Sequence, residues 1–299
     1  MKIDPNHLRQ FVIVGIGEIL WDLLPTGKRL GGAPANVVFH VHNLGAEGYI
    51  VSRVGNDPFG EKIMSNLKSL GLSRRYISID KTRPTGSVSV SLDSKGIPCY
   101  IIHDDVAWDY IAFSQGLSKL ASLADAVCYG SLGQRSKRSQ DTIRRFLRHS
   151  RKSCLRIFDI NLRHPYYSKA IIAYLLKLSN VLKINEEELS VVAQLLSIQG
   201  GETKILQVLL ERFSLDLVAL TRGERGSLLF SQGRESVHPG YPVEVKDTVG
   251  AGDSFTAALM LGLLEGHDLD RINENANRLA SNVCTQDGAW SKLSTNFYG

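Results

Sequence analysis

The chain has 299 residues, of which 43% are hydrophobic and 22% are charged, and these proportions exclude a disordered or collagen-like protein. Lysine and arginine outnumber aspartate and glutamate by 35 to 30, a small excess that indicates nucleic-acid binding only if basic residues gather on one face. The densest basic cluster, between residues 135 and 152, is typical of a solvated helix face, so no nucleic-acid partner is expected.

Membrane insertion and export are also disfavoured. The longest nearly apolar runs, residues 11–17 and 257–264, are far shorter than the ~20 residues that a bilayer-spanning helix needs. Residues 1–10 are polar and lack the apolar core of a signal peptide. The four cysteines, Cys99, Cys128, Cys154 and Cys284, are widely separated, which argues against a zinc knuckle or a disulfide framework. We therefore expect a cytoplasmic protein with reduced thiols and no membrane partner.

Short apolar strands alternate with amphipathic helices along most of the chain. A buried strand is expected at residues 11–15, followed by a helix at 33–44, a strand at 49–54 and a helix that begins at Asp57 and ends at Gly71. Later strands are expected at residues 126–129, 156–159, 181–184, 217–220 and 227–231. This alternation predicts an α/β fold whose doubly wound, mostly parallel sheet is flanked by helices.

One region breaks this rhythm. Residues 87–92 alternate polar and apolar side chains, Asp93 to Gly96 form a turn signal, and an apolar run follows at 99–102. Residues 17–30 offer further strands with a turn at 25–27. We predict a small antiparallel β lid, made of residues 17–30 and 84–103, on a single domain that spans residues 1–299. A half-polar sheet of this kind covers a site or pairs with a second subunit.

Two glycine-rich segments could bind phosphate. Gly15 and Gly17 follow a strand, but Leu20 stands where a dinucleotide-binding fingerprint needs its third glycine, so a dehydrogenase is disfavoured. By contrast, Gly250, Ala251 and Gly252 immediately precede an apolar helix. Backbone N–H groups at such a helix start converge on one point and, with the helix dipole, form an anion hole.

A carboxylate, Asp253, sits at the same helix start. An N-cap is the commonest role of aspartate there, and the dipole is expected to lower its pKa. An N-cap does not explain the preceding small residues or the second acid, Asp247. An anion hole beside a carboxylate fits phosphoryl transfer, because amides hold the phosphate while the acid accepts a hydroxyl proton.

Asp247 to Asp253 match the D-T-x-G-A-G-D signature of the ribokinase-like (PfkB) carbohydrate kinases at every fixed position, so the chain resembles this family. Residues 31–36 are similar to the family's G-G-x-x-x-N signature, residues 185–188 to its N-x-x-E element, and residues 221–226 to its T-x-G-x-x-G element. The resemblance covers essentially the whole chain, from Gly15 to about Ala289, and implies a ribokinase-like fold. Details at residues 17–22, 106–109 and 159–163 look most like the fructokinase branch.

This resemblance implies that the protein phosphorylates the primary hydroxyl group of a sugar with ATP. Asp253 would be the catalytic base, and Gly250, Ala251 and Gly252 would stabilise the charge of the transferring group. Asn185 and Glu188 would hold Mg²⁺ largely through waters, as this hard cation prefers. The residues expected beside the nucleotide are Asn185, Thr221, Gly223, Gly226 and Asn282. Asp247 and Thr248 match positions that bind a monovalent cation in many relatives, and the role of K⁺ is left open.

The resemblance also implies a set of sugar contacts: Asp22, Gly31, Gly32, Asn36 and Arg163. Ribokinases carry lysine where this chain has Ala33, so conversion of D-fructose to fructose 6-phosphate is favoured over phosphorylation of ribose. Arg163 suits either a neutral ketose or the carboxylate of a sugar acid, which keeps a 2-keto-3-deoxygluconate kinase as the alternative.

A catalytically silent relative that binds a sugar or a nucleotide is a third interpretation. The retention of Asp253 and of the glycine-rich loop opposes it. Lid hairpins of this family often pair between subunits, so a homodimer through residues 87–102 is predicted.

Overall fold

The computed structural model describes residues 11–25, 27–92 and 98–290. Nine strands within these residues form one large sheet: β1 (Val12–Ile16), β4 (Glu47–Gly55), β5 (Ile77–Asp80), β8 (Ala126–Tyr129), β9 (Leu155–Asp159), β10 (Val181–Asn185), β11 (Leu217–Thr221), β12 (Ser227–Ser231) and β13 (Arg234–His238). Their order across the sheet is β13-β12-β11-β10-β9-β8-β1-β4-β5. The α-helices are α1 (Ala33–Asn43), α2 (Pro58–Ser69), α3 (Gln115–Leu123), α4 (Lys137–His149), α5 (Lys169–Leu178), α6 (Glu186–Leu196), α7 (Glu202–Phe213), α8 (Ala251–Leu264) and α9 (Leu269–Cys284).

The large sheet is parallel from β5 to β11, and β12 and β13 extend it in antiparallel fashion. From β1 the chain builds outward through β4 and β5, then returns to the other side of β1 and builds outward again from β8. The doubly wound, mostly parallel sheet predicted from the sequence is thus confirmed. Such a reversal opens a crevice at the carboxyl ends of the central strands, where ligands bind in folds of this kind.

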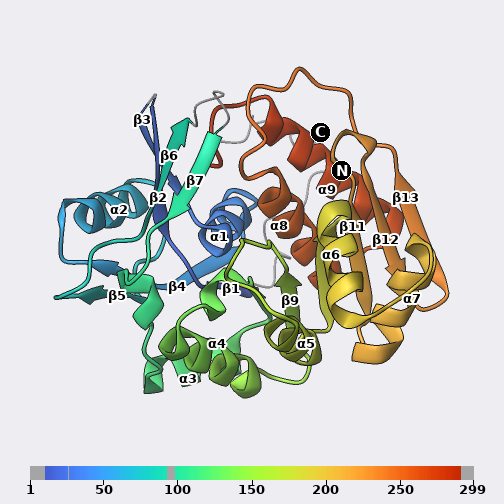
Figure 1. Ribbon diagram of the computed structural model, residues 1–299, viewed down its shortest axis with the longest axis horizontal. Helices are drawn as coiled ribbons and strands as arrows, with labels where there is room; N and C mark the ends of the chain where they lie inside the picture. The colour runs from blue at the N-terminus through green and yellow to red at the C-terminus, as the bar shows by residue number, and fades with distance from the viewer. Residues whose placement is uncertain (1–10, 26, 93–97, 291–299) are drawn as a thin grey trace.

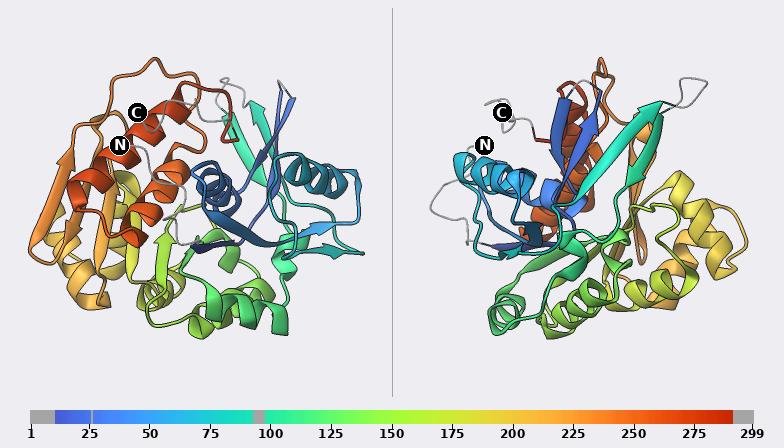
Figure 2. Two further views of the ribbon diagram at one scale, coloured as in Figure 1. Left: turned by 180° about the vertical axis from the view of Figure 1, so that it is seen from behind. Right: turned by 60° about the vertical axis from the view of Figure 1, so that its left-hand side comes forward.

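Helices cover both faces of the large sheet (Figures 1 and 2). On one face, side chains of α1, α8 and α9, such as Val37, Phe255 and Leu279, pack with the strands into one core cluster. On the other face, α3 to α7 contribute a larger cluster that includes Phe146 and Leu175. The helix that follows the glycine-rich loop, α8, is buried along most of its length, which fixes the position of its first turn.

The predicted lid is present as a separate four-stranded sheet, ordered β3-β2-β6-β7. Its strands are β2 (Leu20–Leu24), β3 (Gly27–Gly31), β6 (Ser87–Leu92) and β7 (Pro98–Ile102); β2 pairs antiparallel with β3 and parallel with β6, and β6 pairs antiparallel with β7. The apolar root of the lid, including Trp21 and Leu30, packs on α1 and α2, beside which the lid strands project in Figure 1. The turn predicted at Asp93–Gly96, Thr26 and the polar residues 1–10 lie outside the described residues.

The basic cluster between residues 135 and 152 does not form one uniform solvated face. Arg135 is buried against Asp109, Arg151 pairs with Asp125, and the guanidinium groups of Arg144 and Arg145 lie over aromatic rings. None of the helices in the described part of the chain is long and apolar enough to cross a membrane. Cys128, Cys154 and Cys284 are free.

Candidate active site

Polar side chains stand at the carboxyl ends of four parallel strands of the large sheet, of which β9, β10 and β11 are direct neighbours and β1 is separated from β9 by β8. Glu18 follows β1, Asp159 ends β9, Asn185 ends β10 and Thr221 ends β11. Asn185 and Thr221 are paired in register, and so are Lys183 and Asp159, so these groups lie side by side although they are distant in sequence. The sheet topology thus brings Asn185 and Thr221, which come from two separate sequence motifs, to the same edge of the sheet.

The glycine-rich loop turns directly into α8. Gly250 is the residue before the helix and has φ of +84°, a conformation that disfavours any side chain. A β-carbon at Gly250 would also lie 2.5 Å from the β-carbon of Ala289. The loop thus needs glycine here, and it presents the positive end of α8, including the first-turn positions Ala251 and Gly252, to the crevice.

Asp253 lies in the first turn of α8 and is half-buried. Its Oδ2 atom accepts a 2.7 Å hydrogen bond from Asn36 Nδ2. The pKa of Asp253 is raised to about 6: desolvation and the charge of Asp159 raise it, and together they outweigh Asn36, Lys183 and Arg163, which lower it. The expected lowering by the helix dipole is therefore wrong in sign, because removal from water outweighs the dipole. A carboxyl group with a pKa near 6 is a better proton acceptor than an ordinary aspartate.

A buried cation supports the loop from below. Lys183 Nζ lies 3.1 Å from Asp159 Oδ1, and a β-carbon added to Gly252 would lie 2.9 Å from the same Nζ atom. The hydroxyl group of Thr256, on α8, donates a 2.8 Å hydrogen bond to the other oxygen of Asp159. Burial alone would lower the pKa of Lys183, but Asp159, Glu188 and Asp253 raise it above its usual value. Lys183 therefore stays charged beneath the anion-binding turn.

Asn36 is oriented by a residue from the far end of the described chain. The Asn36 Oδ1 atom accepts a 2.6 Å hydrogen bond from the indole Nε1 of Trp290, whose ring stacks on Phe39. Because the carbonyl side of the amide faces Trp290, its NH₂ group faces Asp253. This arrangement fixes the amide so that it donates to the carboxylate.

Of the expected sugar contacts, Asn36 donates to Asp253, whereas Gly31 and Gly32 lie close to Asp22 and Glu18. A β-carbon at Gly31 would lie 2.5 Å from Asp22 Oδ2, and one at Gly32 would lie 2.5 Å from the carbonyl oxygen of Glu18, so both glycines allow close approach. Burial raises the pKa of Asp22 to about 6, while the charges of Arg163 and Arg29 lower it. The exposed Arg163 guanidinium lowers the pKa of Glu18, Asp22 and Asp253 alike. The charge of Arg163 therefore acts on all three acids.

The expected nucleotide and magnesium residues occupy the neighbouring part of the crevice. Asn185 and Glu188 form a capping box at the start of α6: Asn185 Oδ1 accepts from Glu188 N at 2.8 Å, and Glu188 Oε2 accepts from Asn185 N at 3.0 Å. Glu188 Oε1 also accepts from Leu162 N at 3.0 Å. Both oxygens of Glu188 thus already bind backbone amides, so this carboxylate suits a cation held through water better than one held directly.

Thr221, Gly223 and Gly226 follow one another at the end of β11. A β-carbon at Gly226 would lie 2.0 Å from the carbonyl oxygen of His238, so no other residue fits there. Asn282 lies in the last turn of α9, where its side-chain oxygen accepts from Gln286 at 2.9 Å. The same helix end meets the glycine-rich loop, because Cys284 O accepts from Lys246 N at 2.9 Å.

Asp247 and Thr248 lie at the start of that loop, and the Asp247 carboxylate is already surrounded by donors. Its Oδ1 accepts from Val249 N at 3.0 Å, its Oδ2 from Gly288 N at 3.1 Å, and the Arg29 guanidinium pairs with Oδ2. Nowhere in the described part of the chain do three or more His, Cys, Asp or Glu side chains gather in a way that could hold a metal ion.

Several site residues were missed at the level of sequence: Glu18, Arg29, Asp159, Lys183 and Trp290. Glu18 is 3% exposed, its Oε2 atom has no hydrogen-bond partner within the described residues, and desolvation raises its pKa to about 7. Glu18 and Asp159 stand inside stretches that carried the family resemblance. For Arg29, Lys183 and Trp290 the only signal is the tertiary contact itself.

Comparison with known proteins identifies the family of the chain. A sequence model of the pfkB family carbohydrate kinases matches residues 25–296. An uncharacterized sugar kinase of Pyrococcus horikoshii is 33% identical over 94% of this chain and 92% of its own, and its crystal structure superposes with a TM-score of 0.80 over 93% of each chain.

Two further relatives carry a more specific name. A fructokinase of Klebsiella pneumoniae is 32% identical over 83% of each chain. A double mutant of the fructokinase of Vibrio cholerae, crystallised with fructose, ADP and a potassium ion, superposes with a TM-score of 0.80 over 97% of each chain at 24% identity. The second likeness concerns the fold alone.

Proposed function

The chain belongs to the pfkB family of carbohydrate kinases, and from this premise we propose that it transfers the γ-phosphoryl group of ATP to the primary hydroxyl group of D-fructose. The observation that carries the proposal is the place of Asp253. This proton acceptor, with a pKa of about 6, stands at the anion-binding start of α8 and within the field of the Arg163 guanidinium. The named fructokinase relatives support the choice of sugar.

The proposed reaction needs little covalent help from the protein. The oxygen of the sugar hydroxyl attacks the γ-phosphorus, the bond between that phosphorus and the bridging oxygen of ADP breaks, and the hydroxyl proton passes to Asp253. The first turn of α8 stabilises the charge on the transferring group, and Lys183 adds a fixed positive charge beneath it. Asn36 and Asp22 orient the base and the sugar.

Magnesium fits the residues on the nucleotide side. Asn185 and Glu188 offer oxygen atoms as ligands. Because these oxygens already accept hydrogen bonds from backbone amides, they suit a Mg²⁺ ion bound through water. When bound, Mg²⁺ would neutralise the phosphate charge. The residues of the chain itself would position the nucleotide at Thr221, Gly223 and Gly226, near the end of α9 with Asn282.

One observation favours a second candidate, phosphorylation of 2-keto-3-deoxygluconate. The guanidinium of Arg163 is exposed, and one of its nitrogens donates only to a neighbouring backbone carbonyl, that of Leu162, at 3.0 Å. A guanidinium with a free face can pair in bidentate fashion with a sugar-acid carboxylate. Arg163→Gln would then abolish binding of the sugar acid, whereas turnover of a neutral ketose would persist at a reduced level.

The test is ADP release with Mg-ATP over D-fructose, ribose, 2-keto-3-deoxygluconate, fructose 6-phosphate and a nucleoside. We expect turnover on D-fructose and a drop of about a thousandfold in Asp253→Asn, which keeps the shape but removes the base. A thermal shift with Mg-ATP that persists in this variant serves as the control for folding and nucleotide binding. Turnover on 2-keto-3-deoxygluconate alone would select the second candidate. Silence with every sugar, together with a thermal shift, would indicate a non-catalytic binder.

We also propose that two subunits pair through the lid, over residues 87–102. The exposed Ile101, whose surface is 51% accessible on the outer strand β7, supports this surface. Sedimentation of the wild-type chain should give a dimer, and Ile101→Lys should shift it to a monomer. A monomer at assay concentration in the wild type would rule the pairing out.

A further inference from the structure

The cation site implied by the family resemblance conflicts with the contacts of Asp247. The side chain of Asp247 is 16% exposed. Its two oxygens already accept hydrogen bonds from Val249 N and Gly288 N, and the carboxylate pairs with the guanidinium of Arg29. One of these donors is itself a permanent cation. A monovalent ion bound to this carboxylate would have to displace Arg29 or share an oxygen with a like charge, which is unfavourable.

Arg29 is well placed to hold this position. It lies on lid strand β3, directly opposite Asp22 in the register with β2. Its second terminal nitrogen, Nη2, lies 3.6 Å from a carboxylate oxygen of Asp287, and a β-carbon at Gly288 would lie 3.3 Å from Arg29 Cδ. The arginine is therefore held between two acids and against the backbone that follows α9.

Arg29 is connected to the first turn of α8 through a few intervening contacts. Asp247 and Lys246 are fixed to Cys284 O, Ala251 N donates to Thr248 O at 3.2 Å, and Gly250 packs on Ala289. The loop of residues 247–252 thus packs against residues 284–289. Arg29 pairs with one acid from each segment, Asp247 and Asp287. A lid residue neutralises the acid at the base of the anion-binding loop.

We propose that Arg29 is a positioning residue that takes the place of a monovalent cation, holding the loop of residues 247–252 in shape and making the protein independent of K⁺. Because Arg29 is carried by the lid and faces Asp22, this also links sugar binding to the order of the anion hole. The kinetic part of this inference rests on the proposed kinase activity, whereas its stability part does not.

The kinetic test compares the wild type, Arg29→Gln, Arg29→Lys and a matched control, Lys28→Gln, in KCl, NaCl and choline chloride at equal ionic strength. Lys28 is the neighbouring lid cation, and its ammonium lies 4.9 Å from the ring centre of Phe59. The wild type and the control should turn over equally in all three salts. Arg29→Gln should lose about tenfold or more in kcat in choline chloride, with a smaller change in KM for the sugar, because the loop acts in the transition state. KCl should restore part of the loss, and Arg29→Lys should lie between the two.

A second readout needs no turnover. The thermal unfolding midpoint of Arg29→Gln should rise when K⁺ replaces choline, and that of the wild type should not. Activation or stabilisation of the wild type by K⁺, or an Arg29→Gln variant that behaves as Lys28→Gln does, would overturn the inference. If no sugar is phosphorylated, the proposed function fails while the midpoints still decide the role of Arg29.

Discussion

Two ion-pair networks support the candidate site, and they differ in their access to water. Beneath α8, the side chains of Lys183 and Asp159 are 9% and 3% exposed. At the base of the lid, Arg83 and Asp105 form a pair of similar length, 3.0 Å, whose side chains are 33% and 71% exposed. Water screens the second pair and not the first. The pair beneath α8 is therefore strongly coupled, whereas the exposed pair at the lid base contributes little to stability.

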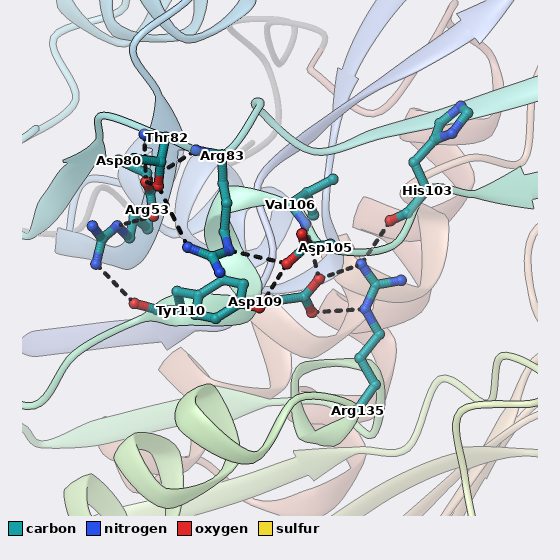
Figure 3. A network of polar contacts seen from close by, with 10 residues as sticks. All are labelled: Arg53, Asp80, Thr82, Arg83, His103, Asp105, Val106, Asp109, Tyr110 and Arg135. Atoms are coloured by element: carbon teal, nitrogen blue, oxygen red, sulfur yellow. Dashed lines mark hydrogen bonds and ion pairs between the residues drawn. The ribbon is translucent and has the colours of Figure 1, made fainter.

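The lid base also contains a buried ion pair, Arg135–Asp109, which contrasts with the exposed pair Arg83–Asp105 (Figure 3). Arg135 binds both oxygens of Asp109, at 2.7 and 2.8 Å, and donates to the carbonyl oxygen of His103 just after β7. Its guanidinium lies 4.0 Å from the ring centre of Trp108. One end of the lid is thus held by a buried ion pair, as the turn above Lys183 is, and burial rather than the presence of charge separates these pairs from the exposed one.

The largest effect should follow from removing the cation beneath α8. Lys183→Met leaves Asp159 buried without its partner and removes the positive charge near Glu188 and Asp253. We expect a loss of about 3–5 kcal/mol in the free energy of unfolding, measured by urea denaturation. The double variant with Asp159→Leu should regain part of this loss, because an apolar pair leaves no unpaired charge. Equal stability of the single variant and the wild type would contradict a buried pair.

A smaller effect of opposite sign is expected at Glu18. The pKa of this carboxyl rises from 4.5 to about 7 on folding, so its stabilising contribution is complete below about pH 4.5 and is lost as the pH rises through 7. Glu18→Gln should therefore stabilise the fold at pH 8 by about 3 kcal/mol and have little effect at pH 4.5. Thermal melts at both pH values measure this difference. A variant that is less stable than the wild type at pH 8 would show that the ionised carboxylate has a partner.

These examples show which parts of the molecule the sequence could predict. The strands from β8 to β12, the start of α8 and the lid hairpins follow from local apolar periodicity and from glycine positions, which are properties of neighbouring residues. The pairs Arg29–Asp247 and Trp290–Asn36 join residues 218 and 254 positions apart, and no local pattern announces them. The pKa of Asp253 was predicted in the wrong direction because the helix dipole is visible in the sequence while desolvation is not.

The pH dependence of kcat/KM should report the ionisation of Asp253 and Asp22. Asp253 must be ionised to accept a proton, so its protonation alone would lower kcat/KM by about tenfold per pH unit below pH 6, with a plateau above that pH. Asp22 also has a pKa of about 6, so the limb belongs to both groups and should be steeper than first order. Asp22→Asn should reduce the slope to first order. A flat profile down to pH 5 would exclude Asp253 as the base.

A more modest effect is expected from the residue that orients Asn36. Trp290→Phe keeps an aromatic ring on Phe39 and removes only the indole donor, so stability should fall by about 1 kcal/mol. The Asn36 amide could then turn, weakening its hydrogen bond to Asp253, and the apparent pKa of the kcat/KM limb should rise. Trp290→Leu, which also loses the stacking, should be less stable than Trp290→Phe. An unchanged pH profile in both variants would reduce Trp290 to a packing residue.

The smallest effect should come from the exposed pair at the lid base, and it sharpens the contrast with Lys183. Arg83→Met removes the contact with Asp105 but leaves a side chain long enough to cover the ring of Tyr110, which the guanidinium now overlies at 3.5 Å from the ring centre. Because water already solvates both charges, the urea midpoint should stay within measurement error of the wild type. Arg135→Met at the same lid base should strongly lower the stability of the fold, because it leaves the buried carboxylate of Asp109 without its partner. If the two lid variants proved equally destabilised, burial would not be what separates the ion pairs that stabilise this molecule from those that contribute little.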